Sequence, residues 1–187
     1  NILAEDLDVF LNAGLRTDYG DDWLHLGAVK LFADGALGPR TAAMQQPYES
    51  SNERGLLLLE EADILELGKQ AASRGIALAV HAIGDRANHV VLNAIEHLRQ
   101  FEHAYGLPHL QHRIEHVQII QPDDLPRLSQ LDVVASVQPV HAPSDMDISN
   151  QHLGDRSQYA YAFQSLLANH ATLVFGSDAP VEPINPF

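Results

Sequence analysis

The sequence predicts an α/β fold in which parallel strands alternate with helices, as in a (β/α) barrel. Short runs rich in Val, Ile, Ala and Leu recur along the chain, as expected for strands buried in a parallel sheet. Segments with apolar residues at helical spacing separate these runs. The segments that follow strands are long and the returns from helices are short, which is typical of a barrel whose functional face lies at the carboxyl ends of its strands.

These patterns locate each element in turn. Strands are expected at 27–32, 76–81, 112–117, 133–138 and 172–177. Helices are expected at 2–13, 61–74 and 85–104, at a short segment beginning at Pro122, and at 157–169. Glycines just beyond the first three helices support their ends. The stretches 33–55 and 139–156 are expected to be irregular, and the first of them is broken by several Gly and Pro residues.

Composition excludes several classes of function. The 187 residues suffice for one domain with a core, and a hydrophobic fraction of 45% with a mean hydropathy of −0.12 indicates a globular chain. The net charge of −14 argues against nucleic acid or an anionic membrane as a partner. No apolar run reaches the length of a membrane span. We therefore expect an acidic cytoplasmic enzyme. Because cysteine is absent, any metal must be held by His, carboxylate or modified side chains.

Four polar residues lie at or just beyond strand ends. They are Lys30 in GAVKLFADG, His81 in IALAVHAIGD, His116 in HRIEHVQII and Asp178 in TLVFGSDAP. The carboxyl ends of parallel strands meet at one edge, so these side chains are expected to lie together. Two imidazoles, a carboxylate and a lysine in a strand suggest a metal site rather than an acid/base pair alone.

Strand alternation refines the prediction. It groups His81 with the small residues Ala77 and Ala79, and it groups His116 with Ile114. Glu115 is then expected on the opposite face from His116. We interpret Glu115 as a partner in a salt bridge with Arg113 or Arg86 rather than as a ligand.

Each candidate also has an ordinary structural interpretation. His81 and His116 could cap loops by hydrogen bonding, and Asp178 could open a turn. Lys30 could be a buried lysine paired with Asp34 or another acid. The functional interpretation of Lys30 is that burial lowers its pKa and exposes a neutral amine. Such an amine can add CO₂, which gives a carbamate that behaves like a carboxylate ligand.

Five stretches taken together resemble the amidohydrolase superfamily of metal-dependent hydrolases. They are VKLFADGALGPRTA, VHAIGDRA, HRIEHVQ, SVQPVHAPSDM and FGSDAPVEPINPF, and they span nearly the whole chain. More narrowly, they look like the branch that contains the N-substituted formamide deformylases. The resemblance implies a distorted (β/α)8 barrel with one or two divalent metal ions, most often zinc, and hydrolysis of a small amide-like substrate.

The resemblance also implies a role for each residue. Lys30 matches the carboxylated lysine that bridges two metals. His81 and His116 match the histidine ligands of the fifth and sixth strands. Asp178 matches the aspartate of the eighth strand, which binds metal and serves as the general base. His141 is a candidate for binding the substrate or its oxyanion, with a solvated loop histidine as the alternative.

Three further loop residues are weaker candidates for a role in the site. They are Arg40, Asp145 and Arg156. For each of them we favour structural pairing within the long loops.

The sequence departs from the family pattern in one respect: it contains no His-x-His pair, which the family carries on its first strand. We therefore interpret residues 1–187 as strands four to eight of the barrel, without the first three strands and the flanking β-domain. Such a chain is expected to expose a sheet edge, to associate with itself or a partner, to bind metal weakly or not at all, and to lack appreciable activity by itself.

Two other interpretations of the chain stay open. One is an inert fragment that serves only as an association unit. The other is a barrel lyase that forms a Schiff base at Lys30. The second lacks a glycine-rich phosphate loop after the last strands, where GSDAPVEP is acidic and contains proline.

Overall fold

The computed structural model describes all 187 residues, and its centre is a six-stranded sheet. Each strand is parallel to the next strand of the sequence, so the spatial order runs from β1 to β6 without a crossover. The strands are β1 (Ile2–Leu3), β2 (Ala28–Phe32), β3 (Ala77–Ala82), β4 (Arg113–His116), β5 (Val134–Val137) and β6 (Leu173–Phe175). The first and last strands are edges, and the sheet is open.

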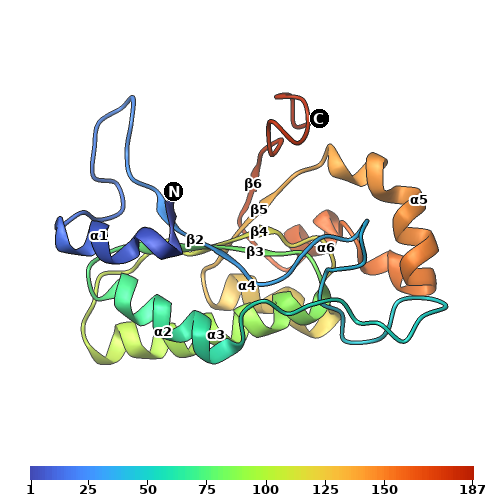
Figure 1. Ribbon diagram of the computed structural model, residues 1–187, viewed down its shortest axis with the longest axis horizontal. Coiled ribbons are helices and arrows are strands. Elements are labelled where there is room, and N and C mark those ends of the chain that lie inside the picture. Colours follow the sequence, from blue (N-terminus) through green and yellow to red (C-terminus); the bar gives the residue numbers. More distant parts are fainter.

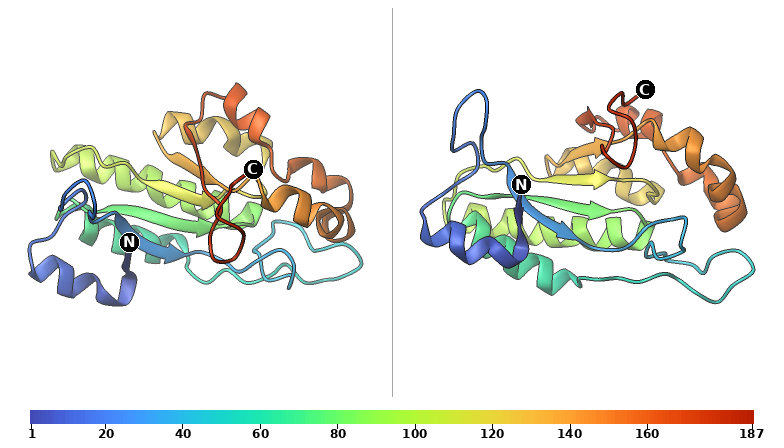
Figure 2. Two further views of the ribbon diagram at one scale, coloured as in Figure 1. Left: turned by 90° about the horizontal axis from the view of Figure 1, so that it is seen from above. Right: turned by 45° about the horizontal axis from the view of Figure 1, so that its top comes forward.

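Helices fill the connections between the strands. The α-helices are α1 (Leu7–Asn12), α2 (Glu61–Ala72), α3 (Asp85–Ala104), α4 (Leu125–Gln130), α5 (His141–Leu153) and α6 (Phe163–Ala168). Short 3₁₀ helices cover Ala4–Asp6, Pro122–Asp124 and Gly154–Tyr159. In Figure 1, α2, α3 and α4 lie on one side of the sheet, and the C-terminal end of the chain lies on the other side, as Figure 2 also shows. None of the helices is both long and apolar enough to span a membrane.

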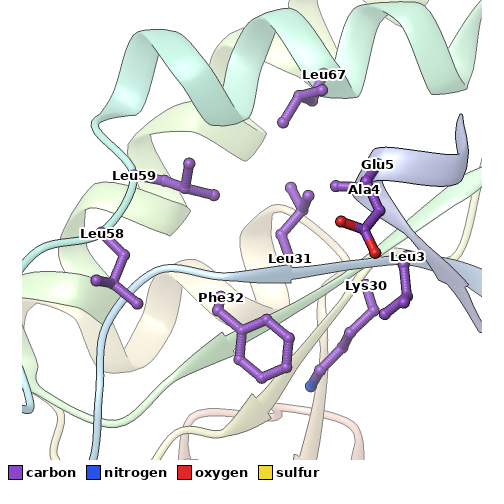
Figure 3. Close-up of a pocket in the computed structure, with 9 residues that line it drawn as sticks. All are labelled: Leu3, Ala4, Glu5, Lys30, Leu31, Phe32, Leu58, Leu59 and Leu67. Carbon is purple, nitrogen blue, oxygen red and sulfur yellow. The ribbon is translucent and has the colours of Figure 1, made fainter.

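Strand alternation separates a helix-facing side from an open side of the sheet. Leu31, Leu78 and Ile114 face the helices and are at most 1% exposed. Figure 3 shows Leu31 directed toward Leu67 of α2, whereas Lys30 and Phe32 lie on the other side of β2. The apolar core therefore lies between the sheet and the helix layer. On the open side Phe32 remains 48% exposed.

The strand register corrects the sequence-based prediction for β4, in which Ile114 shares the face of the candidate ligands with His116. Phe32, His81 and Glu115 are lateral neighbours in β2, β3 and β4. Val80 pairs with Ile114, so Ile114 lies on the helix-facing side together with the large aliphatic residues. Glu115, not Ile114, thus shares the open side with Lys30 and His81.

The element boundaries confirm much of the prediction and correct parts of it. All five expected strands are present, and the predicted helices at 61–74 and 85–104 correspond to α2 and α3. Residues 2–3 form β1 instead of beginning a helix. Ile2 is only 1% exposed and pairs with Val29, so sheet formation and burial override the local helical pattern.

The stretch after β5, which the sequence predicts to be irregular, contains α5. Pro143 lies in the first turn of this helix, where a missing backbone N–H costs little. The helix predicted at 157–169 is divided into a 3₁₀ helix and α6. Tyr161 adopts a φ of +52° between them, which a continuous right-handed helix does not allow.

Candidate metal centre

A cavity of about 550 Å³ lies at the carboxyl ends of the strands. It is lined by all five residues predicted to form the site, namely Lys30, His81, His116, His141 and Asp178. A second cavity, of about 410 Å³, lies beside β2 and is mostly apolar, with Lys30 and Glu5 as its only ionisable side chains (Figure 3). The residues that can do chemistry are therefore concentrated in the first cavity, which joins segments far apart in the sequence.

Three of these side chains converge closely enough to hold one metal ion. His116, His141 and Asp178 each offer a ligand atom, and these atoms lie within 4.8 Å of one another. His141 Nε2 is 3.8 Å from Asp178 Oδ2. His116 Nδ1 is buried and has no hydrogen-bond partner. A buried imidazole nitrogen without a partner is costly in an apo-protein, and a metal ion would satisfy it. The donor set therefore fits a divalent ion.

His116 reaches the cavity through an unusual backbone conformation. Its register partner Ala82 is buried, so a regular strand would direct His116 away from His81. Instead, His116 has a φ of +76°, and Val117 follows with a φ of +44°. This left-handed turn brings the imidazole ring to 4.6 Å from the ring of His81, edge to face. Strained backbone of this kind is concentrated at functional sites.

The electrostatic surroundings keep His116 neutral. Burial lowers the pKa of His116 to about 3, and the neighbouring His81 and Lys30 act in the same direction. A neutral imidazole is the form that binds metal. No proton therefore has to be removed from His116 at neutral pH before a metal can bind.

His81 is held by a carbonyl of the loop after β2. Its Nε2 lies 2.9 Å from the Gly35 oxygen, so Nε2 carries the proton and donates this hydrogen bond. The loop-capping interpretation of His81 thus describes one ring nitrogen, and Nδ1 is left as the nitrogen able to bind metal. Burial lowers the pKa of His81 despite the opposing effect of the Gly35 hydrogen bond.

Lys30 lies across the open side of the sheet, with Nζ 5.0 Å from the centre of the Phe32 ring. Burial lowers the pKa of Lys30, while the charges of Glu115 and Asp178 partly oppose this shift. The suggested ion pair with Asp34 is absent, because the Asp34 carboxylate accepts hydrogen bonds from three backbone N–H groups instead. The amine is therefore not bound to Asp34 and is available to add CO₂ and form a carbamate.

The expected salt bridge of Glu115 is confirmed, because Arg113 Nε lies 2.6 Å from Glu115 Oε1. A regular strand would place Glu115 on the opposite face from His116, but the two residues are not separated in this way in the structure. Both line a smaller cavity of about 350 Å³ together with Lys30 and Asp178. The left-handed conformation of His116 is the reason, since it breaks the regular alternation along β4.

His141 begins α5 and lies between two carboxylates. Its Nε2 faces Asp178, and its Nδ1 is 3.5 Å from Glu182 Oε1. The structure therefore brings His141 to the possible metal cluster itself, while Lys30 and His81 lie in the same cavity outside that close group of three. Sequence reasoning does not identify Glu182, which follows the last strand without any local pattern.

Two of the three weaker candidates make structural contacts, and one of them, Asp145, lies in α5 and also lines the cavity. Arg156 donates to the carbonyl oxygens of Gln46 and Pro47. Asp145 accepts hydrogen bonds from Gln118 Nε2 at 2.9 Å and from Tyr161 Oη at 2.6 Å. Gln118 also lines the cavity and is not identified by sequence reasoning.

Comparison with known proteins identifies the family. Residues 2–187 match the model of the amidohydrolase family. The chain is 39% identical over 168 residues to the protein LONG AFTER FAR-RED 3 of Arabidopsis thaliana, covering 88% of this chain and 28% of that protein. It is 26% identical over 162 residues to an N-substituted formamide deformylase of Arthrobacter pascens, covering 86% of this chain and 29% of that protein.

A solved structure agrees with the sequence relatives. The crystal structure of an uncharacterized metal-dependent hydrolase from Pyrococcus furiosus superposes with a TM-score of 0.86 at 34% identity. The match covers 97% of this chain and 36% of that one, so this chain spans about a third or less of the relatives it matches. The metal-dependent neighbour and the His/Asp cluster both support a divalent metal. This parallel α/β chain belongs to the amidohydrolase family.

Proposed function

We propose that this chain carries part of the active site of a hydrolase that cleaves a C–N bond in a small amide-like molecule with the help of a divalent metal. The convergence of His116, His141 and Asp178 in one cavity is the observation that carries the proposal. The buried, unpartnered Nδ1 of His116 adds to it. Zinc is our first candidate, because it binds imidazole and carboxylate ligands readily.

In this proposal the metal is held by His116 and Asp178, with His81 and a carboxylated Lys30 as the further ligands expected from the family resemblance. A bound divalent ion supplies Lewis-acid chemistry, since it activates water at neutral pH and polarises a carbonyl group. Asp178 is exposed, and its Oδ2 lies 3.8 Å from His141 Nε2. It can therefore take a proton from the attacking water and pass it to the leaving nitrogen.

His141 is suited to the other end of the reacting bond. Its ring lies between Asp178 and Glu182, with Nε2 3.8 Å from Asp178 Oδ2 and Nδ1 3.5 Å from Glu182 Oε1. An N–H group in this position can donate to the carbonyl oxygen as negative charge develops there. The same nitrogen could instead bind the metal, and a mutation described below separates the two roles.

The architecture that we propose for the whole protein is a (β/α)8 barrel. The sequential order of parallel strands and the single helix layer support it, because a barrel has helices outside and side chains inside. β2 to β6 would be the fourth to eighth strands, and the short β1 would be the end of the third. The open side of the sheet, with Lys30 and His81, would then face the barrel interior.

Metal titration tests the ligand set. Zinc binding is measured by competition with a chromophoric chelator for the wild-type chain and for His116→Gln and Asp178→Asn. We expect weak, saturable binding that each substitution removes, because the family's His-x-His pair is not in this sequence. His97→Gln is the control, since His97 pairs with Glu61 outside the cavity. Zinc binding unaffected by either cavity substitution would contradict the ligand assignment.

Hydrolysis is tested in a longer protein that contains this segment within a complete barrel. We expect it to hydrolyse an N-substituted formamide such as N-benzylformamide, to lose activity with a chelator, and to lose it with Asp178→Asn. Activity that persists in both conditions would refute the proposal. These 187 residues alone are expected to be inactive, and clear turnover by them would contradict that expectation.

The lowered pKa of Lys30 also keeps a Schiff-base lyase as a second candidate. Such an enzyme would form an imine between Lys30 and a carbonyl substrate. Borohydride would trap this adduct on Lys30, and the mass of the labelled peptide would reveal it. Absence of trapping, together with chelator-sensitive hydrolysis, would favour the metal-dependent reaction.

A further inference from the structure

Asp34 is a buried carboxylate that connects two segments at the edge of the site. The residue is 2% exposed. Its Oδ2 accepts the N–H groups of Ala43 and Gly84, both at 2.8 Å, and its Oδ1 accepts the N–H of Ile83 at 3.0 Å. A carboxylate away from water must be satisfied by such donors. Asp34 therefore fastens the loop 35–43 onto the turn between β3 and α3.

The fastened loop is compact and forms one wall of the cavity. The Gly35 N–H donates a hydrogen bond to the Thr41 carbonyl oxygen, and the Thr41 N–H donates to the Ala36 carbonyl oxygen at 3.0 Å. The hydroxyl of Thr41 also accepts the Ala36 N–H at 3.0 Å. The cavity is lined by Ala36, Leu37 and Gly38 of this loop. The position of the Gly35 carbonyl is thus set by the loop as a whole.

The Gly35 carbonyl is the group that receives the Nε2–H of His81, at 2.9 Å. Asp34 Oδ1 lies 3.6 Å from the same nitrogen, which is too long for a direct hydrogen bond. In addition, Oδ1 already accepts the Ile83 N–H. The influence of Asp34 on His81 must therefore pass through the loop rather than through direct contact.

We propose that Asp34 is a positioning residue: by fastening the loop 35–43, it holds the Gly35 carbonyl that fixes the ring orientation and the protonated nitrogen of His81. This inference rests on the proposed function only where it takes His81 as a metal ligand. Hydrogen bonds of this kind from the non-ligating nitrogen are what orient histidines at metal sites. His81 then presents Nδ1 to the metal.

Asp85 provides a matched control for a structural role. It is also 2% exposed, and its Oδ1 accepts the N–H of Gln45, just beyond the same loop. Its other carboxylate oxygen is bound by the side chain of Gln121, and it makes no contact with His81. Asp85→Asn therefore perturbs a buried carboxylate near the loop without removing any hydrogen bond on the route from Asp34 to His81.

The test observes the imidazole of His81 by NMR in ¹⁵N-labelled, metal-free protein, so it does not depend on hydrolase activity. His81 is assigned from the signal that is missing in His81→Gln. In the wild-type protein we expect a slowly exchanging Nε2–H and an unprotonated Nδ1. In Asp34→Asn we expect the Nε2–H to exchange about tenfold faster or to disappear, as for a lost hydrogen bond. Asp85→Asn should retain it.

Several outcomes would overturn the proposal. A proton on Nδ1 of His81 in the wild-type protein would by itself contradict the proposal. An unchanged His81 signal in folded Asp34→Asn, or an equal loss in Asp85→Asn, would also contradict it. If Asp34→Asn does not fold, Thr41→Val replaces it, because this variant removes only the hydroxyl that accepts the Ala36 N–H and donates to the Ala36 carbonyl. Faster exchange at His81 in Thr41→Val supports the route through the loop, and unchanged exchange overturns it.

Discussion

Close approach of two backbone segments beside the site depends on a single glycine. A Cβ atom on Gly84 would lie 2.0 Å from the carbonyl oxygen of Ala43, which is far inside any normal contact. The backbone angles of Gly84, with φ −72° and ψ 154°, are open to any residue. Glycine is therefore required at this position for space and not for conformational freedom.

We expect Gly84→Ala to lower the free energy of unfolding by about 1–3 kcal/mol, because the loop ending at Ala43 must move away from the start of α3. Gly38→Ala is the control in the same loop, since a Cβ atom on Gly38 would have no neighbouring atom within 4 Å. Chemical denaturation of both variants measures the difference. Equal stability of the two variants would show that the Ala43 contact does not constrain the fold.

The two possible roles of His141 differ in their effect on metal affinity. If His141 binds metal, His141→Gln weakens zinc binding by about tenfold or more, as expected for a lost ligand. If it binds substrate only, zinc affinity stays unchanged and the KM of the full barrel enzyme rises. Because the proposed reaction uses His141 as a hydrogen-bond donor to the substrate carbonyl, we expect the second result. Chelator competition measures it directly.

The predictability of the site differs from residue to residue. Lys30 and His81 lie on the face that strand alternation predicts, since β2 and β3 are regular. His116 is predicted for the site, but alternation wrongly groups it with Ile114. No residue pattern in HRIEHV indicates that His116 adopts a φ of +76°. The sequence suggests Asp34 only as an ionic partner for Lys30, since its backbone donors come from segments up to 50 residues away.

At the scale of elements, a buried histidine joins the end of α3 to the start of two strands. His112 Nδ1 accepts the N–H of Leu78, and its Nε2 donates to Glu102, which also accepts from Arg99. Burial lowers the pKa of His112 more than Glu102 raises it. For Glu102, burial raises the pKa, but the hydrogen bonds from His112 and Arg99 outweigh burial and lower it overall.

Both shifts predict a loss of stability in acid. His112 and Glu102 each bind fewer protons in the folded state than in the unfolded state, so the free energy of unfolding decreases as pH falls from about 6.5 and further below about 4.5. In His112→Ala the pH dependence between these values should be shallower. The variant should also be destabilised by about 2–4 kcal/mol, because the Leu78 N–H and the Glu102 carboxylate lose a partner.

Urea unfolding across this pH range measures both effects. His97→Ala is a suitable control, because His97 pairs with Glu61 at the surface with 51% of its side chain exposed. Its effect on stability should stay within about 0.5 kcal/mol. An unchanged pH slope in His112→Ala would show that this buried pair does not govern the acid sensitivity of the fold.

The elements themselves are predictable where packing and local pattern agree. α3 carries apolar residues at helical spacing over its full length, and the sequence predicts it with the bounds that the structure has. α5 escapes prediction because its buried residues are Ser149, His152 and Leu153, which show little apolar periodicity. β1 escapes prediction because two residues are too few to show alternation, and only pairing with β2 defines them.

At the scale of the whole molecule, the open side of the sheet is an exposed surface that carries apolar residues. Phe32 and Val174 are 48% and 43% exposed there, and both strands at the edges have unpaired backbone groups. An exposed apolar sheet face with free edges is a surface for association. We therefore expect the chain to form dimers or larger species that depend on concentration, as an open barrel would.

A charge placed on this face tests the expectation. Val174→Lys changes the net charge from −14 to −13, and a smaller net charge by itself favours association. Val9→Lys makes the same change on α1, where Val9 is 66% exposed, and serves as the control. If the open face mediates association, sedimentation velocity should show weaker self-association for Val174→Lys alone, by about tenfold for a buried charge. Similar behaviour of both variants would assign the association to another surface, because the electrostatic change is the same in the two proteins and only its position differs.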